Sequence, residues 1–265
     1  MTGPAGAVPA ADDERGRELA ARLAAVRERI AAATAAAGRE DVPELVVVTK
    51  FHPAEDVLRL AALGVRDVGE NRDQEARAKA AATAGALAGT PLRWHFIGQL
   101  QSNKAKYVVR YAAAVHSVDR GSLVDALSAA MVREQERRRR AGEDGREPLD
   151  CLVQVDLDDR PEAERPSGIG ARGGAAPAEV PALAERIAAA EGLRLRGVMA
   201  VAPLGLDPVP AFRRLAGIAA DLAGRYPGAT WVSAGMSQDL EQAVAAGATH
   251  LRVGTDVLGP RPPVG

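Results

Sequence analysis

The chain has 265 residues, 47% of them apolar, a length that fits either one large barrel or two ordinary domains with a substantial core. Its formal net charge of −1 excludes an overall field that would draw nucleic acid or an anionic membrane, and no apolar run reaches the roughly 18 residues of a membrane-spanning helix. The single cysteine, Cys151, excludes a disulfide within the chain and favours a cytoplasmic location.

The amino-terminal part of the sequence predicts a tail and one long helix. Residues 1–12 are rich in glycine, proline and alanine, which predicts a disordered tail before a single domain over residues 13–265. From Asp13 to Ala37 apolar residues recur on one face of a helix. Those residues are Leu19, Leu23, Val26 and Ile30.

Eight short runs of apolar and β-branched residues follow, separated by helix-like segments. The predicted strands are Leu45–Thr49, Val65–Val68, Trp94–Ile97, Ala114–Val118, Cys151–Val155, Gly197–Val201, Thr230–Ser233 and His250–Val253. The predicted helices are Pro53–Leu63, Asp73–Ala88, Ser102–Tyr111, Leu123–Arg140, Ala178–Glu191, Pro210–Arg225 and Gln238–Ala246. This alternation indicates an α/β fold with a parallel sheet, and eight repeats favour a (β/α)8 TIM barrel over an open doubly wound sheet.

One predicted connection is longer than the others. Residues 157–176 follow the fifth strand and are polar and rich in glycine and proline. A loop of this length is either functional or partly disordered. In a barrel it lies at the same end as the other loops that follow strands, where active sites are built.

Lys50 follows the first predicted strand, in the run LVVVTK. Because side chains alternate along a strand, Val46, Val48 and Lys50 share one face. If that face points inward, the ammonium lies at the barrel mouth, where apolar surroundings lower the lysine pKa and favour a nucleophilic neutral amine. The alternative is an ordinary strand-end lysine that keeps its charge in solvent.

A phosphate site is predicted after the last two strands. The seventh strand leads into residues 233–237, where Ser237 is a candidate N-cap for a helix starting near Gln238, and such a helix start attracts anions. The eighth leads to Gly254, which allows close backbone approach, and to Thr255, which offers a hydroxyl. In a closed barrel these loops adjoin the first strand, so a phosphorylated aldehyde such as pyridoxal 5'-phosphate (PLP) would fit beside a lysine there.

Arg252 shares a strand face with His250 and would point into the barrel mouth. A guanidinium beside the pyridine nitrogen of PLP would keep that nitrogen unprotonated, because it donates hydrogen bonds and accepts none. The alternative is an arginine bound to phosphate or to a loop carboxylate. The four histidines lack metal-ligand spacing, so no metal site is predicted, and His95 and His116 are expected to be core or network residues.

Six blocks of the sequence carry a family resemblance. In chain order they are VVVTK (46–50), VGENRDQE (68–75), WHFIGQLQSNK (94–104), SVD (117–119), RGVMAVAP (196–203) and SAGMSQDLEQAVAAGATHLRVGTDVLG (233–259). They resemble the pyridoxal-phosphate homeostasis proteins, also called the YggS-like or PROSC-like family, which are similar to the barrel domain of alanine racemase. The resemblance implies a PLP-binding barrel of fold type III with an extra amino-terminal helix.

The resemblance also implies roles for individual residues. Lys50 is the implied imine lysine, Asn71 lies near the cofactor ring, Met199 lines the pocket and Arg252 faces the pyridine nitrogen. The implied phosphate contacts are Ser233, Gly235, Met236, Ser237, Gly254 and Thr255. Family members often carry a lysine in the loop after the fifth strand, whereas this sequence has Arg165, which cannot form an imine.

Three functions fit these features. The first is a PLP carrier or reservoir of vitamin B6 homeostasis that has no catalytic residue. Its output is either transfer of PLP to PLP-requiring apoenzymes or control of free PLP. The second is a racemase, which needs acid and base groups on both faces of the substrate carbon. The resemblance implies that alanine racemase takes its opposite-face tyrosine from a partner's second domain, and this sequence ends soon after the eighth strand, which also favours a monomer. The third is a lysine-imine aldolase that binds a sugar phosphate without PLP.

Overall fold

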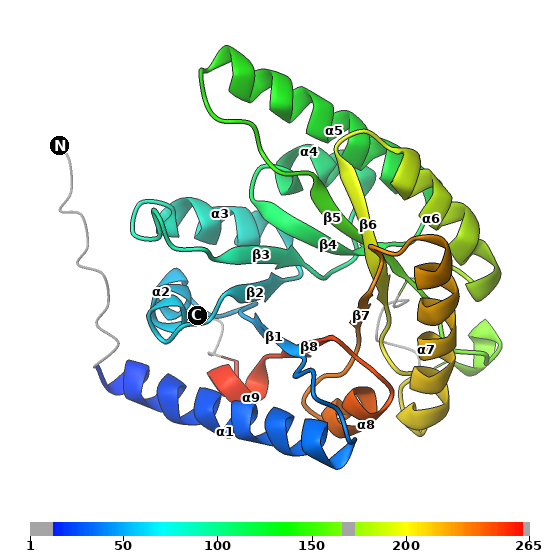
Figure 1. Cartoon of the computed structure of the whole chain (residues 1–265). Coiled ribbons are helices and arrows are strands. Elements are labelled where there is room, and N and C mark those ends of the chain that lie inside the picture. The colour runs from blue at the N-terminus through cyan, green and yellow to red at the C-terminus, as the bar shows by residue number, and fades with distance from the viewer. Residues whose placement is uncertain (1–12, 166–172, 262–265) are drawn as a thin grey trace.

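Eight parallel strands close into one barrel in the order β1 to β8, with β8 paired to β1. The computed structural model describes residues 13–165 and 173–261; the predicted tail, residues 1–12, and the centre of the loop 157–176 lie outside these ranges. Figure 1 shows the helices arranged around the outside of the strands. The closed sheet confirms the predicted (β/α)8 barrel and excludes the open sheet.

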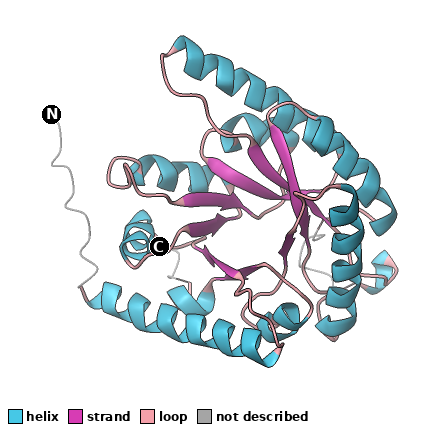
Figure 2. Ribbon diagram, viewed as in Figure 1, coloured by secondary structure: helices cyan, strands magenta, loops and turns pink. Residues whose placement is uncertain are grey.

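The elements follow the predicted alternation (Figures 1 and 2). The strands are β1 (Glu44–Val48), β2 (Asp67–Glu70), β3 (Arg93–Phe96), β4 (Ala112–Val118), β5 (Leu149–Gln154), β6 (Leu193–Met199), β7 (Trp231–Ser233) and β8 (His250–Val253). The α-helices are α1 (Glu14–Ala36), α2 (Ala54–Ala62), α3 (Asp73–Thr83), α4 (Ala105–Val108), α5 (Gly121–Arg140), α6 (Val180–Ala189), α7 (Pro208–Arg225), α8 (Leu240–Ala245) and α9 (Thr255–Leu258). Short 3₁₀ turns are η1 (Ser102–Lys104), η2 (Glu162–Glu164) and η3 (Pro177–Glu179).

The second strand begins later than the sequence predicts. Gly64 has φ of 79° and ends α2, and the Val65 N–H donates to the Leu60 carbonyl oxygen at 3.0 Å. These bonds keep the backbone in a helix-terminating turn. Strand pairing with β1 and β3 therefore starts only at Asp67.

An apolar layer lies between the strands and the surrounding helices. The predicted stripe of α1, from Leu19 to Ile30, is buried, and α1 packs against α2, α8 and α9. Val47, Leu251 and Val253 belong to the same apolar cluster. Figure 1 shows α1 running along the outside of the barrel beside α8 and α9. The helix therefore covers the seam where the barrel closes.

The interior of the barrel is rich in polar side chains. Alternation turns the neighbours of Leu251 and Val253, namely His250 and Arg252, into the barrel. Buried polar residues also come from β2, β3, β4 and β7, namely Asp67, His95, His116 and Ser233. Most barrels fill this space with layers of Val, Ile and Leu. The predicted network role of His95 and His116 is confirmed, because both hydrogen-bond within this interior.

Gly197 in β6 is a position where only glycine fits. Its φ is 147°, and a Cβ there would collide with the backbone of Trp231 on β7. We expect Gly197→Ala to lower the free energy of unfolding by about 3 kcal/mol, because the clash is with a rigid neighbouring strand. Gly217, exposed within α7 with open space around it, is the matched control, and Gly217→Ala should raise that free energy by about 0.5–1 kcal/mol. Urea denaturation of both variants measures the difference, and equal stabilities would contradict the clash.

Candidate functional site

A cavity of about 530 Å³ lies at the carboxyl ends of β1 and β8. Besides these strands, the loop after β6 and the turn after β7 form its walls. Because β8 pairs with β1, the predicted lysine and the predicted phosphate loops meet here. Six of the predicted site residues line it: Lys50, Met236, Ser237, Arg252, Gly254 and Thr255.

Lys50 lies two residues beyond β1 and lines the cavity together with Val48. This confirms that the two side chains share an inward face. Burial lowers the pKa of the Lys50 amine, and the positive charge of Arg261 lowers it further, whereas the carboxylates of Glu70 and Glu75 oppose the shift. A lysine with a lowered pKa has a larger neutral, nucleophilic fraction.

The backbone is strained directly after Lys50. Phe51 has φ of 69°, a left-handed conformation that costs a residue other than glycine about 1–3 kcal/mol. Its N–H donates to Glu75 Oε1 at 2.5 Å, and the Arg261 guanidinium lies 4.1 Å from the centre of its ring. These contacts hold the turn that directs Lys50 into the cavity, and the sequence carried no signal for it.

A second lysine, Lys79, lies buried behind the same strand end. Its ammonium donates to Thr49 O, Glu70 Oε1 and Glu75 Oε1, each at 2.7 Å. Three hydrogen bonds use all of its donors, so Lys79 is a structural cation. Burial raises the pKa of the Glu70 carboxyl, and the contact with Lys79 works in the opposite direction. Glu70 lies at the carboxyl end of β2, just as Lys50 follows the carboxyl end of β1. This position at a strand end could have identified Glu70 as a residue of the site region from the sequence.

Arg252 is 4% exposed and reaches the cavity from β8. One terminal nitrogen donates to Ser233 Oγ at 2.6 Å and the other to the Ala200 carbonyl oxygen at 2.9 Å. Burial lowers the pKa of its guanidinium to about 10, and the charge of Asp239 opposes that shift. Arg252 is therefore charged at neutral pH and held in a fixed orientation.

The predicted helix start near Gln238, with Ser237 as its N-cap, is wrong. Helix α8 begins at Leu240 and its N-cap is Asp239, which gives it only six residues. The Met236 N–H donates to Asp239 Oδ1 at 2.6 Å, so this acidic side chain closes the turn. Met236 and Ser237 still line the cavity, but as a turn and without a helix dipole behind them.

Four predicted site residues do not line the cavity. Ser233 and Met199 are buried neighbours on β7 and β6, and Gly235 is packed so closely that a Cβ would lie 2.6 Å from Ala243. Asn71 follows β2, and its buried Oδ1 has no hydrogen-bond partner within the described residues. Their contacts with a cofactor stay predictions.

The loop after β6 is a wall that the sequence did not single out. Pro203, Leu204, Gly205 and Leu206 line the cavity, and Leu204 and Leu206 are 39% and 49% exposed. Such residues gave no signal because isolated exposed leucines are common on protein surfaces. Only the return of this loop over the strand ends makes them part of the site.

Arg165 is held by its own loop. Its guanidinium donates to Asp156 Oδ2 at 2.8 Å and to the Arg160 carbonyl oxygen at 3.0 Å, and it also contacts the Asp158 carbonyl oxygen. These bonds fold the loop after β5 back on itself. Arg165 therefore serves loop structure in the described part of the chain, residues 13–165 and 173–261.

The other expectations for the site concern metals and the cysteine. The described ranges contain no group of three or more potential metal ligands and no helix long and apolar enough to cross a membrane. Cys151 is fully buried, and burial raises the pKa of its thiol, so this cysteine is a small buried hydrophobic residue of β5.

Comparison with known proteins gives a consistent result. Residues 21–262 match the family described as alanine racemase, N-terminal domain. The pyridoxal phosphate homeostasis protein of Mycobacterium tuberculosis is 43% identical over 258 residues, which are 94% of this chain and 95% of that protein. PipY of Synechococcus elongatus, solved with PLP bound, is 32% identical with a TM-score of 0.70 over 91% of this chain and 100% of that one. An alanine racemase from Corynebacterium glutamicum, 16% identical over 94% of this chain and 62% of its own, shares the fold with a TM-score of 0.61.

Asp67 anchors the polar interior at the opposite end of the barrel. It accepts hydrogen bonds from His95 Nε2 at 2.7 Å and from Arg93 at 2.7 and 2.9 Å. Burial raises the pKa of its carboxyl, but the bonds from His95 and Arg93 outweigh burial and lower the pKa to about 2. A carboxyl with a lowered folded-state pKa stabilises the fold above its unfolded pKa of about 4 and loses that contribution as the pH falls.

We therefore expect Asp67 to contribute about 2 kcal/mol at neutral pH, of which about half is lost by pH 3. Urea denaturation at pH 5 and pH 3 should show a smaller loss of stability for Asp67→Asn than for the unmodified protein. Asp221→Asn, at an exposed carboxylate of α7, is the control and should follow the unmodified protein. Equal pH dependence in all three proteins would contradict the prediction.

Proposed function

Because the chain belongs to the alanine racemase N-terminal domain family, and within it to the pyridoxal phosphate homeostasis proteins, we propose that it binds PLP and acts in vitamin B6 homeostasis. The observation that carries this proposal is the convergence of Lys50 and Arg252 on one cavity from two paired strands. The proposed PLP-binding domain is the barrel with its preceding helix, residues 13–265.

The cavity suits a group of this size and chemistry. Small-molecule pockets commonly enclose about 300–1,000 Å³, and this one has about 530 Å³. PLP supplies an aldehyde for a neutral amine, a phosphate for hydrogen-bond donors and a pyridine nitrogen for one further donor. Lys50 matches the aldehyde and Arg252 matches the pyridine nitrogen. The phosphate is matched by the turn that contains Met236 and Ser237, together with Gly254 and Thr255.

Gly254 brings the two strand ends close together. A Cβ on Gly254 would lie 3.2 Å from the Val48 carbonyl oxygen and 3.3 Å from the Val48 Cβ. A larger residue would therefore push β8 away from β1. We propose that this glycine keeps the phosphate side of the cavity within reach of Lys50.

We propose a binding role in preference to racemisation. A racemase needs a second acid or base facing Lys50 across the substrate, and such a group contributes about 10²- to 10⁴-fold in rate. The three tyrosines of the chain all lie in the described ranges and none lines the cavity. Relatives that align with this chain over nearly their whole length are named pyridoxal phosphate homeostasis proteins.

Transfer of PLP to PLP-requiring apoenzymes extends this proposal. Lys50 is half-buried at an open strand end. An imine between Lys50 and PLP would therefore be accessible for the exchange that releases PLP. The monomeric state and the cytoplasmic location stay predictions from the sequence. Size-exclusion chromatography would test the monomeric state, and mixing of the loaded protein with an apoenzyme would test transfer of PLP.

We expect Lys50→Ala to abolish covalent PLP binding while the barrel stays folded. The change removes the reacting amine but no core side chain, so the melting temperature should move by less than about 3 °C. The measurement is the visible absorption of protein mixed with PLP, followed by borohydride reduction and peptide mass mapping. Lys106→Ala, at an exposed lysine of α4, is the matched control and should keep the band and the adduct.

The outcomes separate PLP binding at Lys50 from PLP binding at another lysine and from a PLP-free lysine aldolase. A full absorption band in Lys50→Ala would show that another lysine carries the cofactor. No band and no adduct in the unmodified protein would overturn PLP binding and favour the lysine aldolase. A reduced pyridoxyl adduct on Lys50 supports the proposal.

Arg252→Ala tests the ring contact. We expect the dissociation constant for PLP to rise about tenfold and the absorption maximum to move, because a charged hydrogen bond is lost and the ring nitrogen is left to protonate. Arg252→Lys keeps the charge but lacks the planar fork, so it should restore only part of the affinity. Arg213→Ala, at an exposed arginine of α7, is the control. Unchanged affinity together with an unchanged spectrum would remove Arg252 from the site.

A further inference from the structure

Four hydrogen bonds cross the barrel interior from the cavity to its opposite end. Arg252 donates to Ser233 Oγ at 2.6 Å, and Ser233 Oγ lies 2.9 Å from His116 Nδ1. His116 Nε2 lies 2.8 Å from His95 Nδ1, and His95 Nε2 lies 2.7 Å from Asp67 Oδ1. All five residues are at most 4% exposed. We call this set, Arg252, Ser233, His116, His95 and Asp67, the hydrogen-bond path.

The chemistry of its two ends gives the path a direction. A guanidinium only donates, so Ser233 Oγ accepts from Arg252. A carboxylate only accepts, so His95 Nε2 carries a proton toward Asp67. If both imidazoles are neutral, each bond then follows in turn. Ser233 donates to His116 Nδ1, and His116 Nε2 donates to His95 Nδ1.

The alternative arrangement places an extra proton on His95. His95 would then donate to both Asp67 and His116, and His116 Nδ1 would donate to Ser233. Ser233 Oγ would accept two hydrogen bonds, and its own proton would lack the acceptor that His116 Nδ1 otherwise provides, in a position with 0% exposure. A buried unsatisfied donor costs about 1–3 kcal/mol. The directed arrangement with two neutral rings is therefore favoured.

We propose that Ser233, His116, His95 and Asp67 are positioning residues that hold Arg252 toward the bound cofactor. This inference rests on the proposed function, since it assigns these residues a role through Arg252. The Ser233 hydroxyl and the Ala200 carbonyl fix the plane of the guanidinium. The path fixes the Ser233 hydroxyl in turn, because each neutral imidazole can present only one acceptor nitrogen.

Charge explains why the path ends at Asp67. Arg252 is buried at one end and Asp67 at the other, with hydrogen-bonded groups polarised in one direction between them. Bonds in such chains strengthen one another in a low-dielectric interior. Asp67 thus supplies the charged acceptor at which the polarised hydrogen bonds end, while Arg93 balances its charge.

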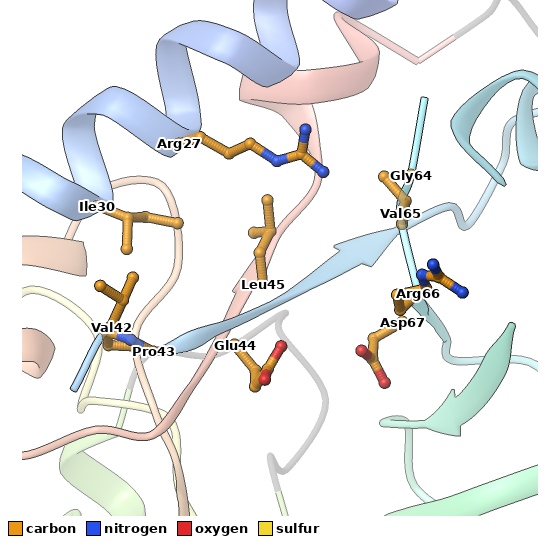
Figure 3. Close-up of a pocket in the computed structure, with 10 residues that line it drawn as sticks. All are labelled: Arg27, Ile30, Val42, Pro43, Glu44, Leu45, Gly64, Val65, Arg66 and Asp67. Carbon is orange, nitrogen blue, oxygen red and sulfur yellow. The ribbon is translucent and has the colours of Figure 1, made fainter. Parts of the chain in front are cut away.

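The lower end of the path is anchored independently of the cavity. Asp67 accepts two hydrogen bonds from Arg93. It also lines a separate hollow of about 230 Å³ at the amino ends of β1 and β2. Figure 3 shows Asp67 and Glu44 on the side of this hollow that lies away from Arg27 of α1. Arg93 therefore sets the position of Asp67, and Asp67 sets the orientation of His95.

His250 provides a natural control in the same interior. It is 3% exposed, and its ring centroid lies 6.5 Å from that of His116 and 4.2 Å from that of Trp231. Its Nδ1 is hydrogen-bonded to Thr249 Oγ1 at 2.8 Å, so it is engaged outside the path. Replacing it disturbs the same core without breaking the path.

The first test is nitrogen-15 NMR of the histidine rings in the protein without added PLP, at neutral pH. We expect His95 and His116 both to be neutral and protonated at Nε2, with each signal assigned by its disappearance in a His→Gln variant. A doubly protonated His95, or a proton on His116 Nδ1, would overturn the directed path. This readout does not depend on cofactor binding.

The second test measures PLP binding by absorption. Ser233→Ala breaks the link to Arg252, and we expect the dissociation constant to rise about tenfold and the absorption maximum to move as for Arg252→Ala. Asp67→Asn keeps an acceptor but removes the charge, so it should shift the maximum in the same direction by less. His250→Gln should leave the dissociation constant within about twofold of the unmodified protein.

Thermal melts identify variants that fail to fold. If Ser233→Ala fails to fold, the more conservative Asp67→Asn serves as the test of the path. Folded path variants with the affinity and spectrum of the unmodified protein would overturn the positioning role while leaving PLP binding intact. A spectral shift of the same size in His250→Gln would also overturn it, by showing a general core effect. Lack of PLP binding by the unmodified protein would instead overturn the proposed function on which this role rests.

Discussion

Pairing of β8 with β1 is the contact on which the candidate site depends. Val46 opposes Arg252 in this pairing, so the first and last strands of a long sequence become neighbours. Lys50, which extends from β1, and Arg252, Gly254 and Thr255, which belong to β8 and its exit, then face one cavity. Helix α1 packs outside this seam against α8 and α9, so the extra helix stabilises the closure that creates the site.

Several structural features cooperate to present Lys50. The strained Phe51 turn is held by Glu75, and Glu75 is itself held by the buried ammonium of Lys79. Lys79 also neutralises Glu70, which would otherwise place an uncompensated carboxylate in the interior. Breaking such a buried pair typically costs about 3–5 kcal/mol, so this arrangement is rigid. One lysine is thus used for structure, which leaves the other free to react.

The polar interior distinguishes this barrel from one that is filled with aliphatic layers. Burying Asp67, two histidines and Arg252 costs desolvation, which is offset only because every member of the path is hydrogen-bonded. Replacing buried ion pairs with aliphatic side chains of similar volume is often neutral or stabilising. The hydrogen-bond path is therefore better explained by the orientation of Arg252 than by stability. It connects Asp67, at the amino end of β2, with Arg252 at the cavity through hydrogen bonds.

The sequence by itself determined the barrel, the covering helix α1, the inward face of Lys50 and the approach of the last two loops to it. It could do so because strand alternation, helical spacing and the number of repeats can be read from the sequence. Once eight strands close into a barrel, these patterns decide which side chains face inward and which loops are neighbours. It misplaced the start of α8, where Asp239 rather than Ser237 caps the helix, since both residues are acceptable caps and only packing selects between them. The strain at Phe51, the burial of Lys79, the role of Leu204 and Leu206 in the cavity wall and the path from Arg252 to Asp67 were decided by tertiary structure alone. Each joins residues far apart in the chain, and the sequence does not record which of the possible partners of a polar side chain becomes its neighbour.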